Sequence, residues 1–182
     1  MGPTSSGKTT LGRAVTRRLR RRALGAVHYD GDEVRGFFGP DYGFSAADRF
    51  RVVQTLVHLA NKAAEAGLQV VVSALTAAAP ARVYVIENIG NLMVGYVNCP
   101  VAVCALRDPK GLYRRAANGE IDSLIGFNTP YLPPEYPDIV VDTAALTVDQ
   151  GVELLEASLL ARIGPLVGDD GNRKPTYAGS LD

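Results

Sequence analysis

The chain has 182 residues, 47% of them hydrophobic and 21% charged, which is enough for one globular domain with a sizeable core. Its formal net charge is zero, which argues against an overall field that would attract nucleic acid or an anionic membrane surface. No apolar run reaches the length of a membrane span, and Cys99 and Cys104 lack the spacing of metal ligands. These features predict a cytoplasmic protein with reduced thiols that binds neither nucleic acid nor membrane.

The first residues of the chain form a phosphate-binding pattern. Residues 2–9 read Gly-Pro-Thr-Ser-Ser-Gly-Lys-Thr, a full match to G-x-x-x-x-G-K-[ST]. Glycines let the backbone amides turn toward a phosphate, the lysine supplies positive charge, and the last hydroxyl is placed to bind Mg²⁺. We therefore predict that ATP and Mg²⁺ bind at Gly2, Ser5, Ser6, Gly7, Lys8, Thr9 and Thr10.

A buried parallel strand normally leads into such a loop, and in this chain Met1 alone precedes it. Two interpretations are open: either Met1 is the end of that strand, or the fold lacks the strand. The second interpretation predicts a gap in the centre of the sheet and a poorly anchored loop.

The hydrophobic periodicity predicts alternating helices and strands. The expected helices are 8–22, 33–38, 46–66 with Ser45 as its cap, 77–88 broken near Pro80, 101–106, 107–118 and 147–163, and the expected strands are 26–30, 68–73, 92–98 and 139–141. This alternation predicts a three-layer α/β fold of the P-loop NTPase class, a mostly parallel sheet with helices on both faces. We expect a single domain over residues 1–164, with a lid at about 119–137, and a loose tail at 165–182.

Carboxylates and a polar side chain follow two of the predicted strands. Asp30 and Asp32 come at the end of strand 26–30, and Thr76 follows strand 68–73. Because ligands bind beyond the carboxyl ends of parallel strands, we expect these groups at the site, with the carboxylates acting on Mg²⁺ or on a substrate hydroxyl. Asp30 or Asp32 is equally suited to cap the next helix, and capping does not exclude catalysis. Arg35 is placed to hold an anion, whereas His28 is expected to be a packed strand residue.

Several further runs occur in the order found in one enzyme family. They are Asp30-Gly31-Asp32-Glu33-Val34-Arg35, Gly43-Phe44-Ser45 with Asp48-Arg49, and Arg107-Asp108-Pro109-Lys110-Gly111-Leu112-Tyr113. Over about residues 2–143 the chain resembles the adenylyl-sulfate kinases, which move the γ-phosphate of ATP to the 3′-hydroxyl of adenosine 5′-phosphosulfate.

The resemblance implies roles for individual residues. Lys8 and the loop amides would hold the ATP phosphates, and Thr9 with Asp30 would hold Mg²⁺. Asp32, or Asp30, would orient or deprotonate the acceptor hydroxyl, so the catalytic set is Lys8, Asp30 and Asp32. The acceptor nucleotide would meet Asp32, Arg35, Phe44, Arg49, Thr76, Lys110, Leu124 and Phe127, with Phe44 against its base. The resemblance also suggests a homodimer.

The acceptor half departs from the family pattern. Glu33 stands where the family usually has Asn, and Val52, Gln54 and Thr55 stand where it has acceptor-binding polar residues. Thr76-Ala77-Ala78-Ala79 lacks an aromatic residue and an arginine, unless Arg82 takes that place, and Leu124 matches the lid Phe of the family. We therefore expect a kinase for adenosine 5′-phosphosulfate or for a nucleotide with another 5′ group. A kinase for a different small-molecule alcohol and a nucleotide-binding subunit without turnover are the alternatives.

Overall fold

The structure, a computed structural model, describes residues 1–39 and 43–163, so the predicted tail at 165–182 lies outside the described residues. The elements in chain order are α1 (Lys8–Arg21), β1 (Ala26–Asp30), α2 (Gly31–Phe37), α3 (Ala46–Glu65), β2 (Gln69–Ser73), α4 (Ala79–Asn88), β3 (Gly95–Asn98), α5 (Val101–Arg107), α6 (Leu112–Ala117), β4 (Ile139–Asp142) and α7 (Val148–Ile163). The predicted alternation of helices and strands is therefore confirmed.

The strands form two parallel pairs. β1 pairs with β2, from Ala26 opposite Gln69 onward, and β3 pairs with β4, from Gly95 opposite Ile139 onward. Within residues 1–39 and 43–163 the two pairs are not joined to each other. The phosphate loop is nevertheless anchored, because the Met1 amine donates to the Gly95 carbonyl at 2.5 Å and the Val97 N–H donates to the Met1 carbonyl at 2.8 Å. The expectation of poor anchorage is wrong.

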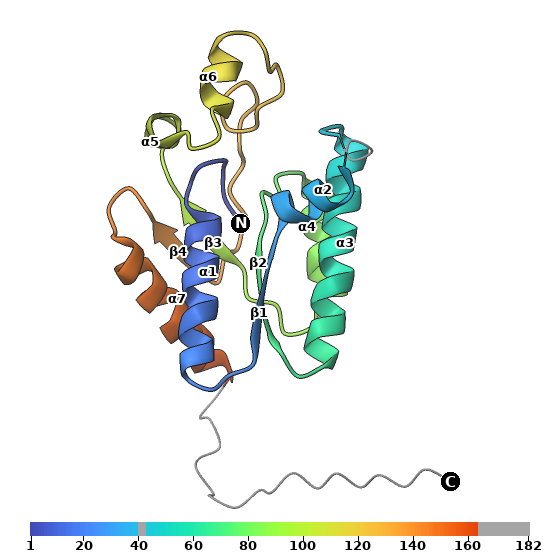
Figure 1. Cartoon of the computed structure of the whole chain (residues 1–182), viewed down its shortest axis with the longest axis vertical. Helices are drawn as coiled ribbons and strands as arrows, with labels where there is room; N and C mark the ends of the chain where they lie inside the picture. Colours follow the sequence, from blue (N-terminus) through green and yellow to red (C-terminus); the bar gives the residue numbers. More distant parts are fainter. Residues whose placement is uncertain (40–42, 164–182) are drawn as a thin grey trace, which may run out of the picture.

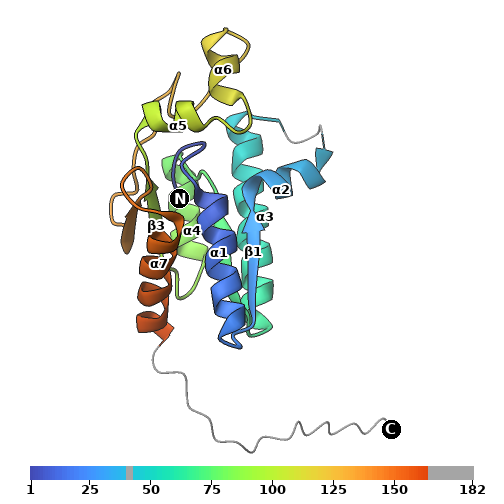
Figure 2. The same cartoon turned by 60° about the vertical axis from the view of Figure 1, so that its left-hand side comes forward.

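Helices cover both sides of the strand layer. α1 contacts α7, β1 and β2, whereas α3 contacts α4, β1 and β2. Figures 1 and 2 show α5 and α6 beyond one end of the strands, on the side where the loop before α1 lies. This arrangement is the predicted three-layer α/β fold, and it gathers the loop and the strand ends on one side of the molecule.

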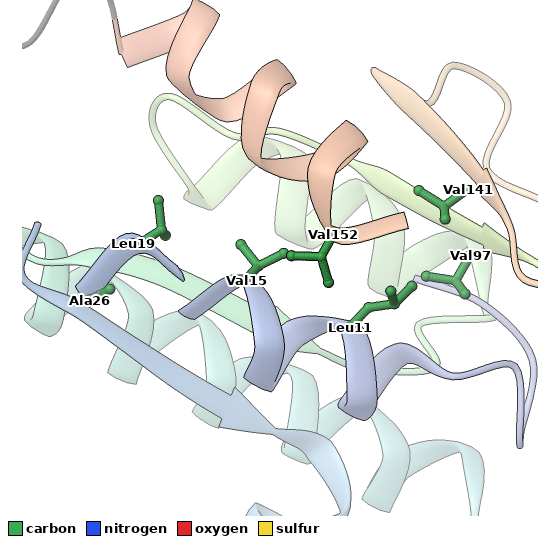
Figure 3. Packing of buried hydrophobic residues seen from close by; sticks show 7 residues of the cluster. All are labelled: Leu11, Val15, Leu19, Ala26, Val97, Val141 and Val152. Carbon is green, nitrogen blue, oxygen red and sulfur yellow. The ribbon is translucent and has the colours of Figure 1, made fainter. Parts of the chain in front are cut away.

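The main core lies between α1, α7 and the strands. Leu11, Val15 and Leu19 form one stripe of α1 that packs with Val152 of α7, and Val97 and Val141 of β3 and β4 complete the cluster (Figure 3). The spacing of four residues places the α1 side chains on a single helix face. This packing fixes the first turn of α1, and with it the end of the phosphate loop.

Several element boundaries differ from the expectations; for example, the helix expected over 107–118 is α6, Leu112–Ala117. α4 begins at Ala79 and has Pro80 in its first turn, so the predicted break near Pro80 is wrong: the first turn of a helix does not need the N–H that proline lacks. α2 begins at Gly31, because the Asp30 side chain caps it, and β3 begins at Gly95. The Ser45 cap of α3 is confirmed, since its side chain accepts from the Asp48 N–H.

Gly12 allows α1 to pack against the strands, and we expect Gly12→Ala to destabilise the protein. A Cβ there would lie 2.5 Å from Ser73 Oγ and 2.7 Å from His28 Nε2. Overpacking of this kind costs about 1–3 kcal/mol of unfolding free energy, measurable by urea denaturation. Gly36→Ala is the matched control, because it also adds a methyl group to a helix but has open space there. Equal unfolding free energies for the two variants would show that the close approach of Gly12 to Ser73 and His28 does not restrict the residue at this position.

Candidate active site

The loop from Gly2 to Thr9 has backbone angles that side chains rarely adopt. Gly7 has φ 98° and precedes α1 directly, and Ser5 has φ 61°. A Cβ on Gly2 would lie 2.5 Å from the Val97 carbonyl oxygen, so this position accepts only glycine. The two glycines of the motif are therefore required by the shape of the loop.

Hydroxyl groups outside the loop hold its carbonyls. Tyr113 donates to the Thr4 carbonyl at 3.0 Å, and Thr143 donates to the Ser6 carbonyl at 2.8 Å. Because a carbonyl and the following N–H point in opposite directions in a trans peptide, the N–H groups of Ser5 and Gly7 face away from these hydroxyls. Because the carbonyls of Thr4 and Ser6 are held by these hydroxyls, the N–H groups that follow them are oriented to bind an anion.

Two buried loop hydroxyls lack partners. Ser5 Oγ and Ser6 Oγ accept or donate no hydrogen bond within the part of the chain that the structure describes. Buried polar atoms without partners are costly, so an oxygen-rich ligand at this loop would stabilise it. Thr10, in contrast, is exposed on α1.

Lys8 crosses the loop. Its ammonium donates to the Pro3 carbonyl at 2.6 Å. Burial lowers the pKa of Lys8 to about 8, although the charges of Asp32 and Asp30 oppose this shift. The Lys8 backbone is held from behind, because Ser73 Oγ donates to its carbonyl at 3.0 Å and also contacts His28 Nε2 at 2.8 Å. His28 is thus a packed strand residue, as expected.

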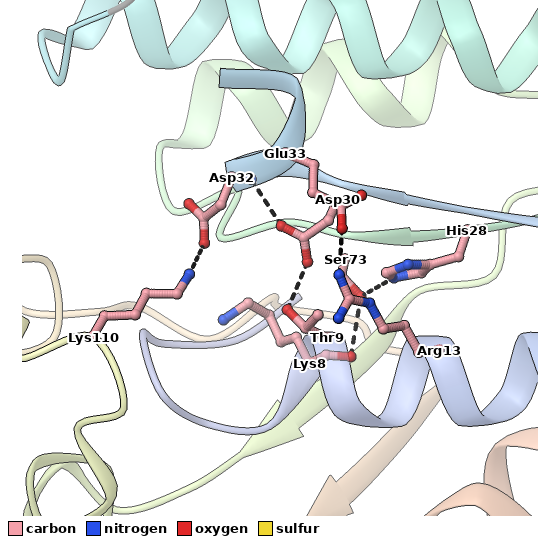
Figure 4. Close-up of polar contacts among 9 residues, drawn as sticks. All are labelled: Lys8, Thr9, Arg13, His28, Asp30, Asp32, Glu33, Ser73 and Lys110. Atoms are coloured by element: carbon pink, nitrogen blue, oxygen red, sulfur yellow. Dashed lines mark hydrogen bonds and ion pairs between the residues drawn. The ribbon is translucent and has the colours of Figure 1, made fainter. Parts of the chain in front are cut away.

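Asp30 connects the loop to α2. It is buried, and its Oδ2 accepts from the Thr9 hydroxyl at 2.6 Å, while its Oδ1 accepts from the Asp32 N–H at 2.8 Å (Figure 4). Asp30 is therefore the helix cap that the sequence allowed, and it also lies beside the hydroxyl expected to bind Mg²⁺.

The other two carboxylates of this region each pair with a cation from another element. Asp32 forms an ion pair with Lys110, which comes from the segment between α5 and α6 (Figure 4). Glu33 pairs with Arg13 of α1, so its negative charge is offset, and both side chains are largely exposed. The negative charge that Glu33 has in place of the family's Asn is thus balanced by Arg13.

Phe44 and two arginines gather at the start of α3. The guanidinium carbon of Arg35 lies 4.7 Å from the centre of the Phe44 ring, and that of Arg49 lies 5.8 Å from it. Arg49 also donates to the carbonyl of Ser123 at 3.4 Å. Burial, followed by the charge of Arg35, lowers the pKa of Arg49. Two cations beside one exposed ring form a suitable surface for an anionic nucleotide.

Arg82 is committed to other contacts. Its Nε donates to the Thr76 carbonyl at 2.9 Å, and its other nitrogens donate to the carbonyls of Leu132 and Pro133. Its guanidinium also lies 5.5 Å from the ring centre of Tyr131. Arg82 therefore holds the segment predicted as a lid, and it does not supply the free acceptor cation that the sequence considered. Thr76 itself is buried.

The two substrate-binding residues predicted in the lid, Leu124 and Phe127, differ in exposure. Leu124 is buried in a cluster with Cys99, Cys104 and Tyr113, which argues against the predicted substrate contact. Phe127 is exposed, and its ring meets the Tyr113 ring edge to face at 5.9 Å. Burial raises the pKa of the Cys104 thiol to about 12, so this thiol is not a nucleophile.

Sequence reasoning missed the supporting residues of the site. The roles of Tyr113, Thr143 and Arg82 depend on tertiary contacts, and no local pattern indicated them. The pairing of Lys110 with Asp32 joins residues 78 positions apart. For Ser73 the sequence did contain an indication of its role. It is the last residue of the strand before Thr76, so it was expected near the site.

The scaffold is a three-layer α/β fold, and its phosphate loop carries Lys8. Asp30, which caps α2, and Asp32 lie beside this loop. These features define a P-loop kinase, a phosphotransferase. A family model described as "Adenylylsulphate kinase" matches residues 1–142. The chain belongs to the adenylylsulphate kinase family.

Individual relatives support this assignment. The adenylyl-sulfate kinase of Synechococcus sp. (strain JA-3-3Ab) is 38% identical over 158 residues, covering 87% of this chain and 90% of the relative. The probable adenylyl-sulfate kinase of Pyrococcus abyssi is 35% identical over 154 residues, covering 85% of this chain and 88% of the relative. The APS kinase CysC of Mycobacterium tuberculosis, solved in complex with AMPPNP and APS, superposes with a TM-score of 0.83 at 31% identity, covering 87% of this chain and 94% of that one.

The lowered pKa of Lys8 predicts that ATP binding weakens at alkaline pH. Phosphate binds the ammonium form, which dominates below pH 8 and is lost as the pH rises through the pKa of about 8 of the free protein. Bound phosphate raises the pKa of Lys8. Between pH 8 and this higher pKa, we expect the affinity for ATP to fall by up to about tenfold per pH unit. Calorimetric titration at several pH values measures this. The Lys8→Met variant should bind ATP more weakly at every pH, and its ATP affinity should not fall over this pH range. An equal fall in both proteins would show that a group other than Lys8 causes the pH dependence.

Proposed function

We propose that the protein transfers the γ-phosphate of ATP to the 3′-hydroxyl of adenosine 5′-phosphosulfate, or of a related nucleotide with a different 5′ group. The observation that carries the proposal is the double contact of the buried Asp30 carboxylate with Thr9 and with the start of α2. It brings the phosphate loop next to the helix that bears Asp32 and Arg35. A phosphate donor and an acceptor alcohol would thereby meet.

The loop fits a triphosphate. Ser5 Oγ and Ser6 Oγ are buried hydroxyls without partners in the described ranges, and Lys8 lies across the loop mouth. The Thr9 hydroxyl and the Asp30 carboxylate are adjacent hard oxygen donors of the kind that Mg²⁺ prefers. No cluster of three His, Cys, Asp or Glu residues occurs in the described part of the chain, so phosphate oxygens and water would supply the remaining ligands. Bound Mg²⁺ would neutralise charge on the transferred phosphate.

Asp32 is the stronger candidate for the group that accepts the proton of the acceptor hydroxyl. Asp30 already accepts two hydrogen bonds, whereas Asp32 is exposed and has Lys110 as its partner. An entering hydroxyl would replace Lys110 at the Asp32 carboxylate, which frees the ammonium of Lys110 for an anionic group of the nucleotide. Lys8 would move from the Pro3 carbonyl to the transferred phosphate. The chain thus supplies positioning and charge, the main needs of phosphoryl transfer.

The remaining cations restrict the acceptor. Arg35 and Arg49 flank Phe44 and would hold the anionic 5′ group while the ring packs on the base. Val52 is buried with Val34 and Leu56, so it makes no polar contact, and Arg82 is bound to the lid segment. The acceptor side therefore has fewer cationic groups than the family pattern, which suits an acceptor with a smaller or less charged 5′ group and leaves adenosine 5′-phosphosulfate as the reference acceptor.

Domain, location and assembly remain part of the proposal. We assign residues 1–164 to one kinase domain with the lid at about 119–137. Both cysteines are free thiols, which suits the reducing cytoplasm. No helix within residues 1–39 and 43–163 has the length and apolar character to cross a membrane. The homodimer stays a prediction.

The enzyme should release ADP when ATP, Mg²⁺ and adenosine 5′-phosphosulfate are supplied together. Asp32→Asn should lower kcat by about 10²–10⁴ because the carboxamide is no longer a proton acceptor, while ATP affinity is retained. A coupled ADP assay with product analysis by mass measures both effects. Glu33→Gln is the control: Glu33 is adjacent and pairs with Arg13, so its kcat should stay within about twofold. ADP release that no nucleotide acceptor stimulates would contradict the proposal.

Phe44→Ala distinguishes a nucleotide acceptor from another alcohol. Loss of base stacking, worth about 1–3 kcal/mol, should raise the acceptor KM by about 5–150-fold and leave the KM for ATP unchanged. Phe37→Ala serves as the control, because Phe37 is a neighbouring phenylalanine with 86% of its surface exposed. An unchanged acceptor KM in Phe44→Ala would favour an acceptor that has no base.

A further inference from the structure

The phosphate loop contains a tight turn with an unusual residue at its third position. The turn runs from Pro3 to Ser6, because the Ser6 N–H donates to the Pro3 carbonyl at 3.3 Å. Within it Ser5 has φ 61°, whereas the φ of Thr4 is negative. This order of signs is that of a type II turn, whose third residue has φ of about +80° and is usually glycine. Ser5 therefore has a backbone conformation that a residue with a side chain disfavours.

The alternative form of such a turn differs by the rotation of one peptide group. In the commoner type I turn the third residue has φ of about −90°, which suits serine, and the peptide between the second and third residues is turned over. In this loop that peptide joins Thr4 to Ser5. When turned over, it would direct the Thr4 carbonyl toward the side from which a phosphate approaches, and the Ser5 N–H away from it. The carbonyl oxygen would repel the anion that the amide attracts.

Tyr113 of α6 holds this peptide in the orientation that serine disfavours. Its hydroxyl donates to the Thr4 carbonyl at 3.0 Å, on the side opposite to the Ser5 N–H. The side chain is 3% exposed, and burial, followed by the neighbouring Cys104, raises the pKa of Tyr113. The hydroxyl therefore keeps its proton and remains a donor. The ring packs edge to face on Phe127, so the hydroxyl has a fixed place, and a turned-over peptide would lose the bond to it.

We propose that Tyr113 is a positioning residue for ATP: its hydroxyl selects the turn that presents the Ser5 N–H to the phosphates, a turn that glycine at position 5 would adopt unaided. The free energy of one hydrogen bond and the cost of a positive φ at serine are similar in size, so loss of the bond populates the turned-over form. ATP then binds only the remaining fraction of molecules, and its apparent affinity falls in proportion. The inference rests on the proposed binding of ATP at the loop, but not on transfer to an acceptor.

The test measures ATP affinity by calorimetric titration near neutral pH for Tyr113→Phe in three backgrounds: the unmodified chain, Ser5→Ala and Ser5→Gly. In the unmodified chain we expect Tyr113→Phe to weaken ATP binding by about 3–10-fold. With Ser5→Ala the loss should remain, because alanine also disfavours a positive φ. With Ser5→Gly the loss should shrink to less than about twofold, because glycine adopts this φ without cost. Each background has its own reference, so the effect of removing the Ser5 hydroxyl cancels.

Tyr96→Phe is the matched control. The Tyr96 hydroxyl is also a partly buried donor, to Asn98 Oδ1 at 3.1 Å, but it belongs to β3 and lies outside the loop. The Tm of this variant measures the cost of losing one hydroxyl bond, and its ATP affinity should stay within about twofold of that of the unmodified chain.

The single variants at position 5 give a second measurement that does not require Tyr113→Phe to fold. Ser5→Gly should melt about 2–6 °C above Ser5→Ala, because the turn strains alanine and not glycine. Equal Tm values for these two variants would show that position 5 is not strained, which would overturn the proposal.

Two results of the titrations would also overturn it. An equal loss of ATP affinity in the glycine and alanine backgrounds would show that the Tyr113 hydroxyl does not act through the turn. ATP binding by Tyr113→Phe as tight as by Tyr96→Phe would show that the hydroxyl is not needed to orient the peptide. Either result, with ATP bound by the unmodified chain, leaves the proposed function intact, whereas an unmodified chain without affinity for ATP would contradict both.

Discussion

The buried carboxylate of Asp30 holds the two halves of the active site in register. One oxygen receives the hydroxyl of Thr9 at the end of the phosphate loop, and the other receives the N–H that starts α2. Hydrogen bonds to a charged acceptor are about twice as strong as neutral ones, and a buried charge without partners is costly, so both contacts are strongly favoured. Asp32, Glu33 and Arg35 all lie on the short helix that this carboxylate caps. A single side chain therefore fixes how the start of α2, with the residues predicted to bind the acceptor, lies relative to the phosphate loop.

Two lysines of the predicted site have partners within the protein. Lys8 rests on a carbonyl of its own loop, and Lys110 rests on Asp32. Each ammonium therefore lies at its predicted site with a partner from the protein itself. The segment predicted to be a lid also has such contacts: Arg49 of α3 donates to the carbonyl of Ser123, and Arg82 of α4 donates to the carbonyls of Leu132 and Pro133.

The sequence predicted the local features well because these depend on nearby residues. The glycines of the loop, the Ser45 cap and the stripe of Leu11, Val15 and Leu19 follow from spacing and from backbone requirements. The motif also indicated which strand end carries the carboxylates. The sequence did not show which of Asp30 and Asp32 is the cap, because either residue suits the position and the choice depends on the contact with Thr9.

Interactions between distant segments were beyond sequence reasoning. Arg82 was considered as an acceptor cation, but three carbonyls occupy its nitrogens. Leu124 matched a lid residue by motif, yet burial beneath α5 and α6 removes it from the surface. Glu33 appeared as an excess charge because its partner, Arg13, is 20 positions away. In each case the residue type was read correctly, and its role was decided by a neighbour that a single sequence does not reveal.

The anchorage of the phosphate loop explains how its shape persists beside a gap in the sheet. Met1 pairs with β3, Tyr113 and Thr143 hold two loop carbonyls, and Ser73 holds the carbonyl of Lys8. These contacts come from four separate parts of the chain, so they restrain the loop from several directions, whereas a strand would restrain it along one line. They fix the orientation of the loop amides, but they do not fill the space between β2 and β3. The geometry of the loop therefore does not depend on β2 and β3 being joined to each other.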